Sequence, residues 1–239
     1  MGAVGSNPYD FPEEEIAAVR NKFPKLALRD PGVWDGEIDI DATYNEERIT
    51  DSFKIGIVAS DKYPHELPAM IEIGGRTNSI AEKYRLTDRR DLHYNVKNRV
   101  ACLCVKQEEK IKFPPGSNLV NFIDDLVIPY LYGLSYYDQH GKWPWGEYSH
   151  GGLGLLEFYA ENGEQTVEQI EEVAKSFVAD DHWKEYSRQF RKPSAERFCV
   201  CGSQKPFRKC HPRAWQGVER LHADLKRLEV NIYKLYRRS

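Results

Sequence analysis

The sequence predicts an α+β fold, with an antiparallel meander of strands flanked by helices and, after it, a small C-terminal zinc-knuckle and helix. Two observations support this prediction. Polar and apolar residues alternate along three consecutive segments, as in strands with one buried face. Near the C-terminus, a Cys-x-Cys pair and a Cys-His pair have the spacing of a zinc site. A chain of 239 residues is long enough for one full domain and a small accessory one.

A helix is expected ahead of the strands, beginning near Pro12. Acidic residues occupy positions 13–15, in its first turn, where they interact favourably with the positive end of the helix dipole. Its buried stripe consists of three apolar residues at helical spacing, which are Ile16, Val19 and Phe23.

Three strands are predicted after this helix, at residues 36–42, 49–59 and 69–73. Short turns join them, so we expect an antiparallel meander. Between the second and third strands, Pro64 and Pro68 fix the backbone and cannot donate hydrogen bonds to a central ladder. This connection is therefore expected to be rigid.

The segment that follows places an imidazole, an amide and two thiols close together in the sequence, at His93, Asn95, Cys102 and Cys104. A thiolate is a strong nucleophile, and a nearby amide can stabilise the oxyanion that forms when the thiolate attacks a carbonyl. On these residues alone, the preferred interpretation is plainer: a buried strand with two small apolar thiols and a satisfied histidine.

The order of these features resembles that of a ubiquitin-conjugating enzyme. That family has a Tyr-Pro and proline pair between its later strands, a His-Pro-Asn motif, and a catalytic cysteine followed by leucine. The matching residues here are Tyr63, Pro64 and Pro68, then His93 and Asn95 with Tyr94 in place of the proline, then Cys102 and Leu103. The gap from Asn95 to Cys102 is slightly shorter than is usual in the eukaryotic enzymes, and Cys104 stands where they often have an acid.

The resemblance implies a UBC fold in a catalytic domain at residues 1–160. It implies that Cys102 forms a thioester with the C-terminus of a partner protein, which an amine on a target then displaces. Asn95 would stabilise the oxyanion or brace the loop, and His93 would hold the segment by hydrogen bonds. No phosphate-binding glycine loop follows a predicted strand. Activation must therefore come from another protein, or Cys102 must attack a peptide bond directly, as in a transpeptidase.

Residues 118–131 are apolar at helical spacing, with Pro129 expected to break or kink the helix. An aromatic and glycine-rich run follows at 132–154. It is similar to one in bacterial ubiquitin-conjugating-like proteins found beside cGAS-like nucleotidyltransferases in CBASS anti-phage operons. That resemblance implies a cGAS-like nucleotidyltransferase as the conjugated partner. The alternative is a packed loop in which Trp143 and Trp145 cover the core.

The zinc prediction rests on four residues, Cys199, Cys201, Cys210 and His211. Thiolate and imidazole ligands in two close pairs suit a tetrahedral zinc ion, and four protein ligands indicate a closed, structural site. The motif resembles the SEC-C zinc motif. A disulfide role is disfavoured because the other cysteines are Cys102 and Cys104 and no secretory segment is visible.

Residues 161–195 are interpreted as a helical linker, and residues 196–239 as the zinc motif with an amphipathic C-terminal helix. That helix has an apolar seam of Val218, Leu221, Leu225, Leu228, Ile232 and Leu235. The seam is expected to pack on the protein itself or on a partner helix. The same end of the chain is basic, so contact with nucleic acid is a minor alternative to a solvated helical face.

The formal charge of −3 is nearly balanced, and no apolar run is long enough to span a bilayer. These features predict a cytoplasmic protein without a membrane partner. The sequence thus favours a cysteine-dependent acyltransferase with structural zinc. Two alternatives remain open: a non-catalytic binding adaptor with a conjugating-type fold, and a nucleic-acid-binding zinc protein.

Overall fold

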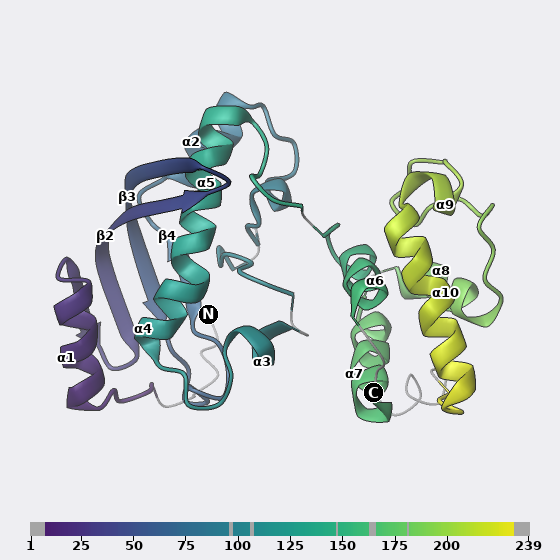
Figure 1. Ribbon diagram of the computed structural model, residues 1–239, viewed down its shortest axis with the longest axis horizontal. Coiled ribbons are helices and arrows are strands. Elements are labelled where there is room, and N and C mark those ends of the chain that lie inside the picture. Colours follow the sequence, from purple (N-terminus) through teal and green to yellow (C-terminus); the bar gives the residue numbers. More distant parts are fainter. Residues whose placement is uncertain are drawn as a thin grey trace. The chain divides into compact units, whose positions relative to one another are not determined.

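Figure 1 shows the computed structural model, which describes residues 8–95, 98–105, 108–146, 148–162, 166–180 and 182–231. The chain forms two compact units, Met1–Gly146 and Glu147–Ser239. The first contains a four-stranded antiparallel sheet with helices, so the predicted α+β class is confirmed. The boundary lies between residues 146 and 147, whereas the sequence placed it between 160 and 161. Among the described helices, none combines the length and apolar character needed to cross a bilayer.

The sheet of the first unit is a simple meander in the order β1-β2-β3-β4. Its strands are β1 (Leu26–Asp30), β2 (Val33–Tyr44), β3 (Glu47–Val58) and β4 (Ala69–Glu72). The predicted strands lie in β2, β3 and β4, and β1 was missed because it is short and follows the first helix directly. Asn45 and Glu46, which connect β2 and β3, both have positive φ, as in the two-residue turns that match strand twist.

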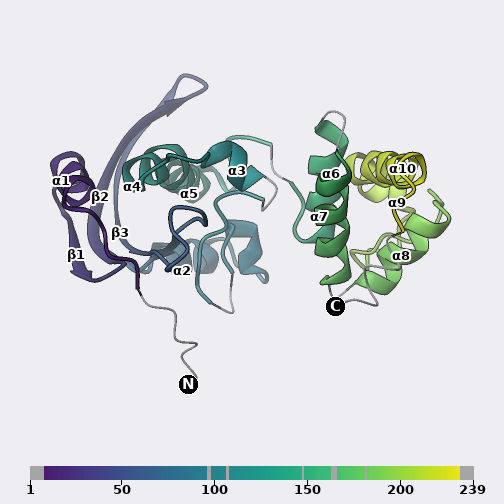
Figure 2. The same cartoon turned by 90° about the horizontal axis from the view of Figure 1, so that it is seen from below.

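Apolar and polar residues alternate along β2 and β3, so one side of the sheet is a continuous apolar face. The buried side chains of this face are Trp34, Ile38, Ile40, Ile49, Phe53, Ile55 and Ile57. Helix α5 (Ile128–His140) lies across the sheet and contacts β2 and β3 (Figures 1 and 2). Helix α1 (Glu13–Lys22) has the predicted acidic first turn and packs against β1.

Two short helices lie between β4 and the segment from His93 to Cys104: α2 (Arg76–Lys83) and the 3-10 turn η1 (Arg89–Leu92). That segment is followed by α3 (Glu109–Lys112), α4 (Leu119–Phe122) and the π-helical segment η3 (Ile123–Val127). The π-helical segment runs directly into α5.

The sequence predicted a break or a kink at Pro129, and no break occurs there. Helix α5 continues through Pro129 to His140, so the first part of the aromatic run at 132–154 is helical. A π-helical segment directly precedes this proline, and such local adjustments are a common way for a helix to accommodate a residue without an N–H donor.

The second unit is helical and has its own core. Its elements are α6 (Gly152–Glu161), α7 (Val167–Val178), α8 (Trp183–Arg191), α9 (Phe207–Cys210) and α10 (Pro212–Arg227). Helices α6 and α10 contact each other closely at Gly217, where an added β-carbon would lie 2.0 Å from the carbonyl oxygen of Leu156 (Figure 2). Glycine at this position lets the two backbones approach.

Much of the predicted linker at 161–195 belongs to this core, because Ile170, Phe177 and Phe190 are buried in it. The seam of the last helix packs on the protein itself at Val218, Leu221 and Leu225. The seam residues Ile232 and Leu235 lie outside the described residues.

Candidate functional site

The structure brings the predicted His93-x-Asn95 motif and Cys102 into one short hairpin. The backbone amide of Cys102 donates to the carbonyl oxygen of His93 at 2.7 Å. The amide of Asn95 donates to the carbonyl oxygen of Val100 at 3.0 Å. His93 and Cys102 therefore face each other across the hairpin, with Asn95 two residues further along.

This hairpin is attached to the sheet. Tyr94 and Ala101 form an isolated antiparallel bridge, and the amide of Ala101 donates to the carbonyl oxygen of Met70 in β4 at 2.8 Å. Tyr94 and Ala101 are buried, whereas Asn95 and Cys102 are exposed. This is the alternation expected of extended chain with one covered face. The hairpin thus presents an amide and a thiol to solvent from a backbone anchored in the core.

The two neighbouring thiols differ in environment. The Sγ of Cys102 is exposed and lies 3.7 Å from the carbonyl oxygen of Cys104. Cys104 packs against the core. Burial raises the pKa of its thiol to about 12, and the charges of Glu109 and Glu108 add to this effect. Because the thiolate is the nucleophilic form, Cys104 is a poor candidate at neutral pH and Cys102 is the accessible one.

Trp143 supports the hairpin from the segment that follows α5. Its ring lies edge-on to the His93 imidazole with centroids 4.8 Å apart, and its Nε1–H donates to the carbonyl oxygen of Asp91 at 2.9 Å. The indole fits against α5 because residue 133 is glycine, where an added β-carbon would lie 2.1 Å from a Trp143 ring carbon. Trp143 therefore covers the core, as the alternative interpretation of the aromatic run proposed, and also holds the residues before the hairpin.

Tyr130 supports the same segment, although sequence reasoning did not identify it. Its buried hydroxyl donates to the carbonyl oxygen of Leu92 at 3.1 Å. Burial raises the pKa of Tyr130, so the hydroxyl remains a neutral donor. In the sequence Tyr130 belongs to an apolar helix stripe, and its hydroxyl was the one available sign of a polar contact.

In the second unit, the predicted zinc ligands lie together. One ligand atom from each of Cys199, Cys201, Cys210 and His211 falls within 4.8 Å of the others. The Sγ of Cys199 is 3.2 Å from Nδ1 of His211, and the Sγ atoms of Cys201 and Cys210 are 3.6 Å apart. Zinc–sulfur bonds of about 2.3 Å in a tetrahedron place sulfur atoms about 3.8 Å apart, so the cluster is of the right size for one ion.

Local structure explains how the ligands meet. Cys199 and Cys201 lie on a tight turn, in which the amide of Gly202 donates to the carbonyl oxygen of Cys199 at 3.2 Å. Helix α9 ends at Cys210, and His211 connects it to α10. The ligands therefore come from one turn and one helix end.

The donor chemistry also fits a metal ion. Burial raises the pKa of Cys199 to about 12, and a cation bound next to this thiol would oppose that effect and favour the thiolate. Burial opposes ionisation of Cys201 as well, but hydrogen bonds from Ser203 and the neighbouring thiols hold its pKa below the ordinary value. We conclude that the four residues could hold a metal ion.

Comparisons with family models, with curated proteins and with solved structures gave no significant match to this chain.

Proposed function

We propose that the chain is a ubiquitin-conjugating-type acyltransferase with a UBC fold in its first unit, in which Cys102 is the nucleophile. The observation that supports this proposal is the hairpin, where an exposed Cys102 faces the His93-x-Asn95 motif across paired backbone. The resemblance of the sequence to the conjugating enzymes supplies the reaction type.

The proposed reaction has two steps. The Cys102 thiolate attacks the carbonyl carbon of an activated C-terminus on a partner protein, the activating group leaves, and a thioester forms. An amine of a target then attacks the thioester carbonyl, loses a proton, and displaces the thiolate to form an amide. Asn95 would donate to the oxyanion formed in each step, and His93 would position the hairpin.

The acyl donor in this proposal is the C-terminus of a cGAS-like nucleotidyltransferase, and the setting is CBASS anti-phage defence in the cytoplasm. Support comes from the aromatic and glycine-rich run, which is similar to that of the bacterial conjugating-like proteins of such operons. Activation is supplied by a second protein, or Cys102 attacks a peptide bond directly and the downstream peptide leaves as an amine.

Zinc has a structural role in this proposal, bound by Cys199, Cys201, Cys210 and His211. All four positions around a tetrahedral ion would be filled by the protein, which leaves none for a substrate or a reactive water. The ion would fix the loop between α8 and α10.

The proposal is tested by mixing the full-length chain with a cGAS-like nucleotidyltransferase from the same organism, with and without cell extract as a source of the activating protein. We expect a covalent adduct that thiol reductant removes. It should form with Cys104→Ala but not with Cys102→Ala. Cys102→Ser should give an adduct that reductant leaves intact, because an oxyester replaces the thioester.

Two results would contradict the proposal. An adduct that persists in Cys102→Ala would assign the chemistry to another residue. A folded wild-type protein that binds the partner without forming any adduct would indicate a binding adaptor.

A further inference from the structure

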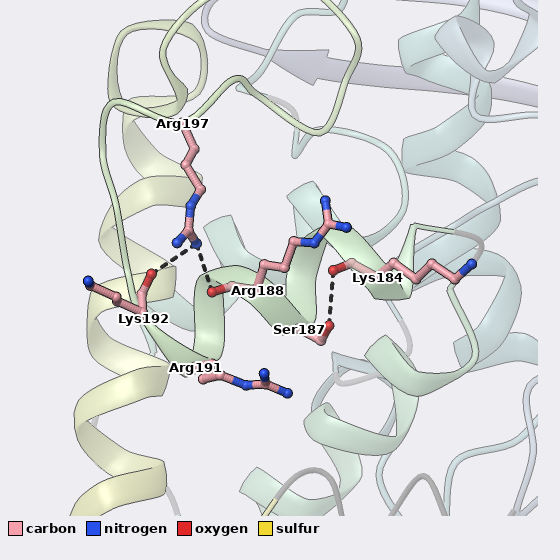
Figure 3. A pocket seen from close by; sticks show the side chains of 6 residues that line it. All are labelled: Lys184, Ser187, Arg188, Arg191, Lys192 and Arg197. Carbon is pink, nitrogen blue, oxygen red and sulfur yellow. Dashed lines mark hydrogen bonds between the residues drawn. The ribbon is translucent and has the colours of Figure 1, made fainter.

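The second unit contains a basic depression that the proposed acyl transfer does not use. It has a volume of about 410 Å³ and is lined by Lys184, Ser187, Arg188, Arg191, Lys192 and Arg197. Five of the six lining residues are cationic, and no carboxylate lines it (Figure 3). The lining comes from α8 and from the loop between α8 and the cysteine turn.

Arg197 has a fixed position in this depression. It reaches from the loop to the last turn of α8, where Nη1 donates to the carbonyl oxygens of Arg188 at 2.8 Å and Lys192 at 3.0 Å (Figure 3). The Arg188 carbonyl also accepts the backbone amide of Lys192 at 3.2 Å, so Arg197 adds a second donor there and supplies one to the Lys192 carbonyl at the helix end. Nε and Nη2 of Arg197 make no hydrogen bond within the described part of the chain and remain available to a ligand.

Three other cations of the depression have no counter-charge. Within the residues that the structure describes, the side chains of Lys184, Arg188 and Lys192 form neither an ion pair nor a hydrogen bond. Three other cations of the same unit do pair with a carboxylate. These pairs are Arg208 with Glu196, Arg213 with Glu161, and Arg227 with Asp224. The depression therefore carries positive charge that no carboxylate of the described residues offsets at these three positions.

The spacing of the cations suits a ligand with several adjacent charges. Lys184 and Arg188 are four positions apart in α8, so they lie on the same side of the helix about 6 Å apart in rise, and Lys192 follows directly after the last helical residue. Like charges held together without counter-ions repel one another, and a multiply charged anion removes this repulsion. Guanidinium groups in addition match the geometry of phosphate oxygens.

We propose that this depression binds adjacent phosphate groups, supplied either by the phosphate chain of a free nucleotide or by the backbone of a nucleic-acid strand. Its volume is in the range of small-ligand sites. The lining residues include no aromatic side chain on which a base could stack, so we expect recognition of phosphates and not of base identity. This inference is independent of the proposed reaction at Cys102.

Two probes distinguish the sources in the full-length, zinc-loaded protein. Inorganic tripolyphosphate is titrated by calorimetry, and a fluorescent single-stranded oligothymidylate is titrated by anisotropy, both at near-physiological ionic strength. Binding of tripolyphosphate indicates a free nucleotide. Binding of the oligonucleotide alone indicates a nucleic-acid backbone, with affinity that falls steeply as salt rises.

The double variant Lys184→Gln/Arg188→Gln should weaken binding of whichever phosphate probe binds the wild-type protein. The expected loss of affinity is about tenfold or more, because the variant removes two charge-assisted contacts. Arg188 holds Arg197 through its backbone carbonyl, so the substitution leaves that contact in place. The matched control Lys175→Gln/Lys226→Gln removes the same net charge from exposed positions on α7 and α10 and should change affinity by less than about twofold. Circular dichroism and zinc content verify folding, and Lys184→Gln/Lys192→Gln replaces the first variant if that one is unstable.

Three results would overturn the proposal. In the first, neither phosphate probe binds. In the second, the control double variant loses as much affinity as the pocket variant. In the third, poly-glutamate of matched charge binds as tightly as the phosphate probe. The last result would indicate an acidic peptide as the partner.

Discussion

The indole of Trp143 packs edge-on against the imidazole of His93, with ring centroids 4.8 Å apart and ring planes at 70°. The same indole donates a hydrogen bond to the backbone of Asp91. A residue that follows α5 thus fixes the backbone just before the hairpin that presents Cys102. The geometry of the candidate site depends on this long-range contact.

Truncating Trp143 should therefore affect both stability and the hairpin. We expect Trp143→Ala to destabilise the first unit by about 3–5 kcal/mol, the usual cost of a buried aromatic. Trp143→Phe should cost about 1–2 kcal/mol, because it retains most of the apolar surface and removes the hydrogen bond from the indole to the Asp91 carbonyl. Urea unfolding followed by circular dichroism measures both. Trp145→Ala, at a half-buried ring, is the control, and an equal loss there would show that Trp143 has no special role.

The two thiols of the site should differ in reactivity with pH. Since burial raises the pKa of Cys104 to about 12, its thiolate fraction should rise about tenfold per pH unit up to that value. At pH 7, iodoacetamide should label the exposed Cys102 first in the zinc-loaded protein. Time-resolved labelling with peptide mass spectrometry checks this order. Labelling of Cys104 as fast as Cys102 at neutral pH would contradict the assignment, and slow labelling of both would favour the adaptor.

Removing the Asn95 amide should slow acyl transfer without unfolding the protein. Its side chain is exposed, so we expect Asn95→Ala to retain the wild-type unfolding midpoint. Transfer should slow by about a hundredfold, the usual loss for one oxyanion donor. Asn98→Ala is the matched control, because Asn98 lies in the same hairpin and accepts a hydrogen bond from the amide of Val100. If both variants slow transfer equally, Asn95 acts through hairpin structure and not through the oxyanion.

Metal removal should unfold the second unit and leave the first intact. Cys199 and the neighbouring Phe207 are buried in the core of the second unit, so loss of the ion would disturb that core directly. We expect one zinc ion per chain by elemental analysis, released by chelator and by mild acid because the ligands bind deprotonated. Cys201→Ala should lose the ion, whereas Cys102→Ala should keep it. A second unit that stays folded after complete zinc removal would contradict a structural role.

The boundary at Gly146 predicts how fragments behave. A fragment of residues 1–146 contains the whole first core and should be monomeric, with Cys102 labelled as in the full chain. A fragment of residues 1–192 should aggregate or bind a hydrophobic dye, because it retains α6 without α10. Leu156 and Tyr159 of α6 would then lose their cover. Gel filtration of both fragments decides between this boundary and one at 160.

The parts of the structure that sequence reasoning predicted are encoded locally. The alternation in residues 36–42 and 49–59 defines strands because the side-chain period of a strand is two residues. The candidate zinc ligands follow from a spacing that a single turn and a helix end can satisfy, and the structure places them within 4.8 Å of one another.

The parts that only the tertiary structure decided depend on partners far apart in the chain. Nothing local to Trp143 indicates that it packs on His93, and nothing local to Gly217 indicates that Leu156 approaches it. The different environments of Cys102 and Cys104 likewise come from core packing around the hairpin, although only one residue separates them. By itself the sequence determined the class of fold and the set of candidate ligands, since period and spacing are local. The domain boundary and the accessibility of Cys102 depend on which residues are buried. Burial results from contacts that the folded chain makes between distant residues, so only the tertiary structure decided them.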